Sequence, residues 1–258
     1  MAILIAVALS FILFRSGDEV DPQGKTDTIN NQEMIMPNIY PVEHASFVME
    51  WDGEIVYVDP VGEAASYTKE GLPNAVVITH GHGDHFDLPL LEEIVTENVV
   101  LVVTEEVFLK LPEALQAIAF VMKNDEVKTA RDITFTAIAM YNLAPDKIQY
   151  HPKGVGNGYV LEKGGVRVYV AGDTEDIPEM RALQNIDIAF VPMNEPFTMS
   201  VEAAAAAVLE FAPSVVYPYH FRGVEGMSDI ALFTNLVRAG NPDITVIAAE
   251  WYKKAEAE

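Results

Sequence analysis

Short apolar runs recur from residue 38 to residue 250, and their pattern predicts alternating strands and helices. Runs without a polar interruption, such as AVVIT at 75–79 and VVLVV at 99–103, are typical of strands buried on both faces. The alternation in DITFTAIAM at 132–140 predicts a strand with one solvated face. The other predicted strands cover 38–60 (two strands around the turn Asp52–Gly53), 158–173 (a hairpin turning at Gly164–Gly165), 186–193, 214–220 and 244–250. The predicted helices cover 88–97, 105–119, 177–184, 200–211 and 229–240.

The order of these elements predicts the fold class. Strands come in runs early in the chain and then alternate with helices, which favours an α/β protein with two sheets and with helices packed outside them. The sequence has no internal repeat of short period and no second linker. We therefore expect one domain over residues 38–258.

The N-terminal stretch differs from the rest of the chain. Residues 1–14 form an apolar run that ends at Arg15, and this is shorter than the ~20 residues of a transmembrane helix. The run suits the apolar part of a signal peptide, although no basic segment precedes it and no A-x-A cleavage site is clear; a buried helix is the alternative. Because a polar stretch follows at once, we interpret 1–15 as an export signal or membrane anchor and 16–37 as a linker. The expected location is exported, periplasmic or membrane-anchored, with the cytoplasm as the alternative and with membrane contact only through this segment.

Composition narrows the range of partners. Half of the residues are hydrophobic, which is enough for a large core. The net charge of −23 argues against nucleic-acid binding, because phosphates would be repelled by most of the surface, and against a polybasic membrane-surface protein. The chain has no cysteine, so disulfides, thiolate metal ligands and thiol nucleophiles are excluded. A small molecule is the expected partner.

Histidines and aspartates stand at the ends of the predicted strands. Three of the six histidines of the chain lie in HGHGDH at 80–85, directly after the strand 75–79. The whole set is His80, His82, Asp84, His85, His151, Asp173 and His220. Neutral imidazole and carboxylate are ligands of borderline divalent ions, and Gly81 and Gly83 would let neighbouring side chains converge. Seven ligands are too many for one zinc ion and about right for two, whereas a polar surface turn would not explain the clustering.

Four signals follow one another along the chain: THxHxDH after a buried strand, a histidine, AGDT, and a histidine after a strand. This series resembles the metallo-β-lactamase fold superfamily over residues 39–222. The segments HASF, VYVDP, HPKGVGNGYV and AGDTEDIPEM are most similar to its lactonase-like branch. The resemblance implies a four-layer α/β/β/α sandwich with the site at one edge of the sheets. Its members often self-associate, so a homo-oligomer is possible. It also implies one metal site of His80, His82 and His151, a second of Asp84, His85 and His220, and Asp173 as the bridge between them.

We therefore expect a hydrolase with two divalent ions, zinc first and manganese or iron as alternatives. A hydroxide shared by the ions would attack a lactone, ester or phosphodiester, and Asp84 would orient it and pass its proton on. One alternative is a single-iron thiol dioxygenase of the same fold, which would use His80, His82, His151 and Asp173. The other is a non-catalytic, metal-stabilised binding protein. The complete second ligand set argues against both.

Six further residues are weaker candidates for contact with ligands or substrate. Asp59 in VDP could accept a hydrogen bond from a ligand imidazole, or could simply end a strand. His44, placed in the first predicted strand, could line the pocket or be a core histidine. The loop residues that could contact substrate, or only shape their loops, are Tyr141, Asn142, Lys153 and Glu195.

Overall fold

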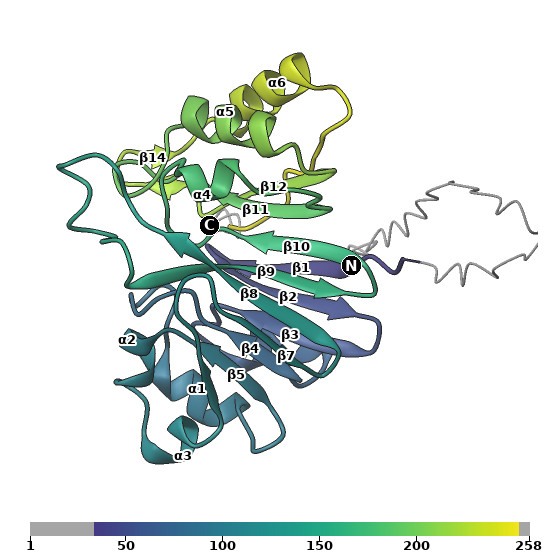
Figure 1. The fold of residues 1–258 in the computed structure, drawn as a ribbon, viewed down its shortest axis with the longest axis vertical. Helices are drawn as coiled ribbons and strands as arrows, with labels where there is room; N and C mark the ends of the chain where they lie inside the picture. The colour runs from purple at the N-terminus through teal and green to yellow at the C-terminus, as the bar shows by residue number, and fades with distance from the viewer. Residues whose placement is uncertain (1–33, 253–258) are drawn as a thin grey trace, which may run out of the picture.

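Two β-sheets lie face to face at the centre of the molecule, and helices lie outside each sheet (Figure 1). The structure is a computed structural model that describes residues 34–252. In spatial order, the first sheet consists of β1 (Asn38–Glu43), β2 (Ser46–Trp51), β3 (Glu54–Val58), β4 (Ala75–Val77), β5 (Val100–Val103) and β6 (Ala119–Val121). The second sheet consists of β15 (Thr245–Val246), β12 (Val215–Tyr219), β11 (Ile188–Pro192), β10 (Val166–Val170), β9 (Gly156–Lys163), β8 (Ile133–Met140) and β7 (Val127–Ala130).

The remaining elements are helices, short helical turns and one small hairpin. The helices are α1 (Leu88–Ile94), α2 (Glu105–Phe108), α3 (Glu113–Gln116), α4 (Pro178–Arg181), α5 (Val201–Phe211) and α6 (Ile230–Gly240). The turns are η1 (Ala64–Ser66) and η2 (Thr68–Glu70), and the hairpin pairs β13 (Arg222–Gly223) with β14 (Gly226–Met227). Strands β3 to β6 are parallel to one another, as are β10, β11, β12 and β15.

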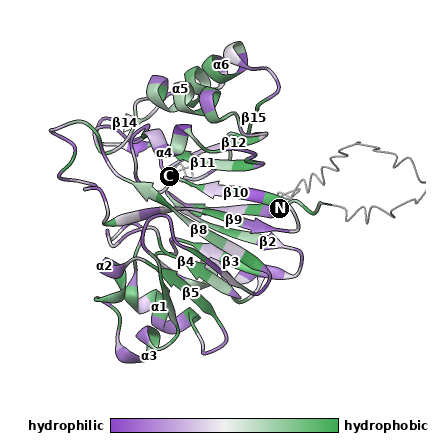
Figure 2. Cartoon of the chain, in the orientation of Figure 1, coloured by the Kyte–Doolittle hydropathy of each residue, from purple (hydrophilic) through white to green (hydrophobic). Residues whose placement is uncertain are grey.

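The layer between the two sheets is apolar. Phe47 of β2 stacks on Phe190 of β11 with ring centroids 4.1 Å apart, so aromatic rings join the sheets. Tyr219 and Trp251 are fully buried in the same layer and make edge contacts with Phe47. Apolar residues concentrate on the central strands, whereas hydrophilic residues recur along the outer helices and loops (Figure 2). Burial of this apolar surface is the main stabilising contribution to such a fold.

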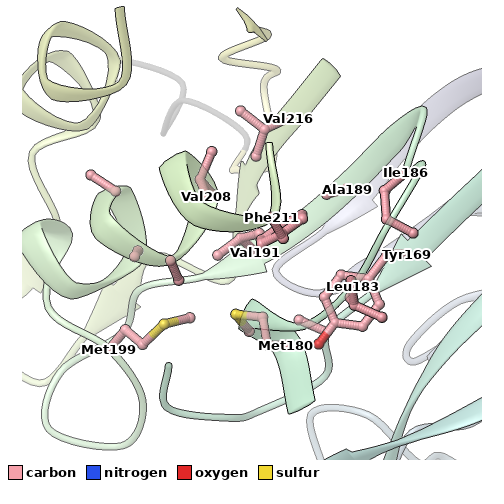
Figure 3. Packing of buried hydrophobic residues seen from close by; sticks show 14 of the residues in the cluster. Tyr169, Met180, Leu183, Ile186, Ala189, Val191, Met199, Val208, Phe211 and Val216 are labelled. Carbon is pink, nitrogen blue, oxygen red and sulfur yellow. The ribbon is translucent and has the colours of Figure 1, made fainter. Parts of the chain in front are cut away.

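Helices complete the two outer layers. In α5, the hydroxyl of Ser200 caps the helix by accepting a hydrogen bond from the N–H of Ala203. Val208 and Phe211 of α5 pack toward Val191 of β11 (Figure 3), together with buried residues of α4 and α6. Buried residues of α1, α2 and α3 pack on the outer face of the first sheet in the same way. The predicted α/β/β/α sandwich is therefore confirmed.

The first predicted strand is in fact two strands joined by a tight turn. Glu43 pairs with Ser46, and the turn between them is His44–Ala45. His44 has a left-handed backbone with φ of 56°, so it lies in the turn and not in the first strand. The sequence has no glycine, asparagine or proline there to indicate a turn.

Two other predicted elements are wrong in their extent. The predicted helix 105–119 is interrupted at Pro112, which has no N–H to donate within a helix, and residues 119–121 pair with β5 as strand β6. The predicted strand 244–250 pairs with β12 only at Thr245 and Val246. The chain then leaves the sheet and brings Trp251 into the layer between the sheets.

The predicted signal or anchor segment 1–15 lies outside the described residues, as do residues 16–33 of the predicted linker. Met34 and Met36 already pack against the layer between the sheets. Within residues 34–252, no helix is long and apolar enough to cross a membrane.

Candidate metal centre

Six segments of the chain each bring a histidine or an aspartate to the same edge of the sandwich. Strand β3 leads into Asp59, β4 into the turn 80–85, β10 into Asp173 and β12 into His220, while the loop from β8 to β9 contains His151 and the β1–β2 turn contains His44. The carboxyl ends of β3 and β4 meet at one edge because these strands are parallel, and the same holds for β10 and β12. The structure thus brings all seven predicted ligands into one cluster.

His80, His82 and His151 form the first potential metal-binding group. Nε2 of His80 lies 3.0 Å from Nδ1 of His82, and one nitrogen from each of the three rings lies within 4.8 Å of the others. Burial, reinforced by His85, lowers the pKa of His80 well below its ordinary value, and burial also lowers the pKa of His151. Neutral imidazoles have a lone pair to offer a metal ion. These three residues are the set that the resemblance implies for the first ion.

Asp173 lies at the centre of the cluster. Its Oδ1 is 3.4 Å from Nε2 of His85, and its Oδ2 is 3.4 Å from Nε2 of His151 and 3.2 Å from Nε2 of His220. Burial opposes ionisation of this carboxyl group, but His220 and His85 outweigh it and hold the pKa of Asp173 well below its ordinary value. One carboxylate therefore faces histidines from three different segments.

Asp84 and His220 belong to a second group, whose third member differs from the expected one. Oδ2 of Asp84 lies 3.5 Å from Nε2 of His220, 3.4 Å from Nε2 of His44 and 3.9 Å from Nε2 of His85. The group whose ligand atoms all lie within 4.8 Å of one another contains His44 instead of His85. The side chain of Asp84 is 47% exposed while His85 and His220 are buried, so Asp84 marks the solvent side of the cluster.

Asp59 and Thr79 fix the orientation of two histidines. Asp59 accepts hydrogen bonds from the N–H and the hydroxyl of Thr79, both at 2.7 Å, and from Nδ1 of His85 at 2.8 Å. Because the hydroxyl of Thr79 donates to Asp59, it can accept from Nδ1 of His80, which lies 3.0 Å away. Both rings then direct Nε2 into the cluster. This is the arrangement by which outer residues orient metal-ligating histidines.

The buried polar atoms of the cluster fit a bound cation. Nε2 of His85 and Oδ1 of Asp173 are buried, yet neither has a hydrogen bond of good geometry to any residue in 34–252. Burial opposes a charge on His85, but Asp173 and Asp59 outweigh it and raise the pKa of His85 well above its ordinary value. Asp173, which faces Nε2 and favours a proton there, would also attract a divalent ion in place of that proton, since metal binding to histidine displaces protons. The donor set of imidazoles and carboxylates suits zinc, manganese or iron.

Glu106 of α2 and Lys110, two residues after α2, hold the turn 80–85 from outside the cluster. Nζ of Lys110 donates to the carbonyl of Gly81 at 2.9 Å, and the N–H of Gly81 donates to Glu106 at 3.3 Å. Neither Gly81 nor Gly83 has a positive φ, so the expected conformational freedom is not used. A Cβ at Gly81 would lie 2.5 Å from Nζ of Lys110. Glycine at this position therefore permits a close approach of Lys110 and Glu106.

Four of the weaker candidates contact one another or their own loops. The hydroxyl of Tyr141 donates to Glu179 at 3.0 Å, and Nζ of Lys153 donates to the same carboxylate at 2.7 Å. The side-chain amide of Asn142 donates to two backbone carbonyls, and Glu195 is largely exposed and forms an ion pair with Lys147. Among the described residues, no hydrogen bond or ion pair joins these four side chains to the seven predicted ligands.

Three residues that contact the cluster are not among the predicted site residues. They are Thr79, described above, Asn194, whose Nδ2 lies 3.5 Å from Nε2 of His220, and Tyr252, whose hydroxyl lies 2.8 Å from Nδ1 of His44. Asn194 is the buried neighbour of the exposed Glu195, and strand alternation after β11 could have favoured it. Tyr252 stands far from every motif, so nothing in the sequence indicates its place.

Replacing Asp59 by asparagine is expected to weaken metal binding about 10- to 100-fold. The amide would place an N–H beside Nδ1 of His85, and the ring would then have its hydrogen on Nε2, the atom that faces Asp173. Asparagine tolerates the left-handed backbone at this position, where φ is 43°. Titration of metal-free protein with Zn²⁺ against a chromophoric chelator measures the affinity.

The matched control is Asp52→Asn. Asp52 is also left-handed, with φ of 47°, but it lies in the exposed β2–β3 turn. This variant should bind metal as tightly as the unchanged chain. If Asp59→Asn did so too, Asp59 would have no role beyond ending its strand.

The sandwich and the cluster of histidines and aspartates at its strand ends together define a metal-dependent hydrolase of the metallo-β-lactamase type. The family model described as "Beta-lactamase superfamily domain" matches residues 38–220, more than half of the chain. The chain therefore belongs to the metallo-β-lactamase superfamily.

Similar proteins agree with this class. A relative from Lysinibacillus sphaericus is 26% identical over 229 residues, covering 80% of this chain and 94% of its own. A relative from Thermococcus onnurineus is 29% identical over 188 residues, covering 69% and 81%. Both are described as "UPF0173 metal-dependent hydrolase". The crystal structure of a Parabacteroides distasonis protein, described as a metal-dependent hydrolase, is 35% identical with a TM-score of 0.73, covering 82% of this chain and 91% of its own.

Proposed function

We propose that the chain is a binuclear hydrolase that adds water to a lactone, ester or phosphodiester. Two divalent ions, zinc first, would supply Lewis acidity and water activated near neutral pH. His80, His82 and His151 would hold one ion, Asp84, His85 and His220 would hold the other, and Asp173 would be shared.

The position of Asp173 is the observation that supports two ions over one. Its Oδ2 faces both His151 and His220, which belong to different proposed ligand sets, while its Oδ1 faces His85. A single-iron dioxygenase would need only the first set and Asp173. It would leave the buried His85 and His220 without a ligand role.

Asp84 is suited to orient the attacking water. Burial opposes its ionisation, but the rings of His220 and His44 beside it outweigh this and hold the pKa of Asp84 well below its ordinary value. The group is therefore a carboxylate at neutral pH. Because it faces solvent at 47% exposure, it can accept a hydrogen bond from water and hold that water beside a substrate.

Charge and motif both favour a small substrate. The net charge of −23 repels polyanions such as nucleic acids. The segments around the proposed ligands are similar to the lactonase-like branch of the superfamily. We therefore place lactones and small esters ahead of phosphodiesters.

Metal content and turnover of the full chain test this proposal. We expect two zinc or manganese ions per chain by plasma mass spectrometry, and hydrolysis of members of a panel of lactones, aryl esters and bis-aryl phosphodiesters. Asp84→Ala should reduce turnover roughly 10²- to 10⁴-fold, the usual contribution of a positioned acid–base group. Circular dichroism should show an unchanged fold.

Asp243→Ala is the control, because Asp243 is exposed in the turn after α6; it should keep full turnover. Full turnover in Asp84→Ala would contradict the role of Asp84. One iron per chain, with oxygen consumption on thiols, would support the dioxygenase instead. Two bound ions with no hydrolysis of any panel member would support the non-catalytic metal-binding protein.

A further inference from the structure

His44, near the start of the described chain, is held beside the candidate metal centre by residues from its C-terminal part. Its ring centroid lies 3.8 Å from that of His220. Its N–H donates to the carbonyl of Trp251 at 3.3 Å, and its own carbonyl accepts from the N–H of His220 at 3.1 Å. These bonds hold a backbone with φ of 56°, which is uncommon outside glycine. The ring therefore has a fixed place at the inner side of Asp84.

Tyr252 determines which nitrogen of His44 has the hydrogen. The hydroxyl oxygen of Tyr252 accepts from the backbone N–H groups of Phe221 at 3.0 Å and Arg222 at 3.1 Å. A phenol that accepts two hydrogen bonds has only its own O–H left to donate. That hydrogen must point at Nδ1 of His44, 2.8 Å away. Burial raises the pKa of Tyr252 to about 12, so the phenol keeps this hydrogen at neutral pH. Nδ1 is the acceptor, and Nε2 has the N–H.

A protonated Nε2 makes His44 a donor and not a metal ligand, although it lies within reach of Asp84 and His220. Its distance of 3.4 Å to Oδ2 of Asp84 exceeds the ~2.7–2.9 Å of a strong charge-assisted hydrogen bond. The Nε2–H of His44 is therefore available to a better acceptor that approaches beside Asp84. The side chain of His44 keeps 13% exposure on the side where Asp84 meets solvent.

We propose that His44 binds the substrate oxygen on which negative charge develops, by donating a hydrogen bond from Nε2, and that Tyr252 is the residue that positions it. The acceptor would be a carbonyl or phosphoryl oxygen of the substrate. The proton stays on His44 throughout, so no bond to it breaks. This inference rests on the proposed hydrolase function and assigns a role to a residue outside the seven ligands.

Three variants distinguish a role of His44 as a hydrogen-bond donor from a role as a metal ligand. His44→Met removes the donor, His44→Gln keeps an N–H at the end of a side chain of similar reach, and Tyr252→Phe removes only the hydroxyl. NMR of the full chain with ¹⁵N-labelled histidine should show His44 protonated at Nε2, and Tyr252→Phe should shift it toward protonation at Nδ1. All variants should contain the same number of metal ions as the unchanged protein.

Inorganic phosphate is a stable oxyanion that probes the site without turnover. By calorimetric titration of metal-loaded protein, His44→Met should bind phosphate about 10-fold more weakly, while His44→Gln should stay within about threefold of the unchanged chain. Equal phosphate affinity in His44→Met, loss of a metal ion from it, or a hydrogen on Nδ1 in the unchanged protein would overturn the proposal. None of these measurements needs a substrate, so failure of the hydrolysis panel would contradict the proposed function separately.

Discussion

Replacing Asp173 with asparagine is expected to lower the metal content to one ion or none per chain and to reduce hydrolysis by about 10³-fold or more. The amide keeps the shape of the side chain but removes the charge that faces His85, His151 and His220 at 3.2 to 3.4 Å. Without that charge, two cations would have no shared carboxylate between them. Plasma mass spectrometry after dialysis, followed by turnover on the substrate found in the panel, measures both effects.

Asp243→Asn is the matched control for this substitution, since it makes the same change in an exposed turn. It should retain its metal and its activity. Adding zinc after removal by a chelator should restore the unchanged chain and the control, but not Asp173→Asn. An Asp173→Asn variant that retained two ions would show that Asp173 is not shared between them.

Replacing Phe190 with alanine is expected to destabilise the protein by about 3–5 kcal/mol. Phe190 is fully buried between the sheets and stacks on Phe47 at 4.1 Å and on Tyr217 at 5.0 Å. Truncation would remove both contacts and leave a cavity where the two sheets meet. This is a large share of the ~5–15 kcal/mol by which a domain is usually stable. Urea unfolding of the metal-free protein measures the change without the contribution of bound ions.

Leu109→Ala provides the comparison, because Leu109 is 73% exposed. Its free energy of unfolding should stay within about 0.5 kcal/mol of the unchanged chain. A similarly small change in Phe190→Ala would mean that the sheets do not depend on this aromatic contact.

Much of the sandwich could be predicted because local pattern and tertiary role agree. The apolar run at 75–78 contains β4, which has strands on both sides, and the capped, alanine-rich run at 200–211 contains α5. The turn at His44–Ala45 could not be predicted, because backbone bonds from residues more than 170 positions away hold it. Residues 119–121 are apolar enough for either helix or strand, and they form a strand because they pair with the edge of β5.

The candidate ligands could be predicted because rare residue types stand next to strand ends. His80 and Asp173 each follow a buried parallel strand, and the topology brings those strand ends together. The residues that orient the ligands are harder to predict. The sequence VDP allows two interpretations of Asp59, as a partner of a ligand histidine or as the end of a strand. Tyr252 reaches His44 through an irregular segment whose path no local pattern specifies.

The hydrogen bond between Tyr252 and His44 joins residues 208 positions apart, and this separation has a consequence during synthesis. At about 5–20 residues per second on the ribosome, Tyr252 is added roughly 10 to 40 seconds after His44. Asp173 and His220 are also translated well after the turn 80–85. Between the addition of His85 and the addition of Asp173, the nascent chain has three closely spaced histidines without the carboxylate that faces His85 in the folded protein. The cluster of predicted ligands can therefore be completed only after His220, at the end of β12 in the second sheet, has been synthesised.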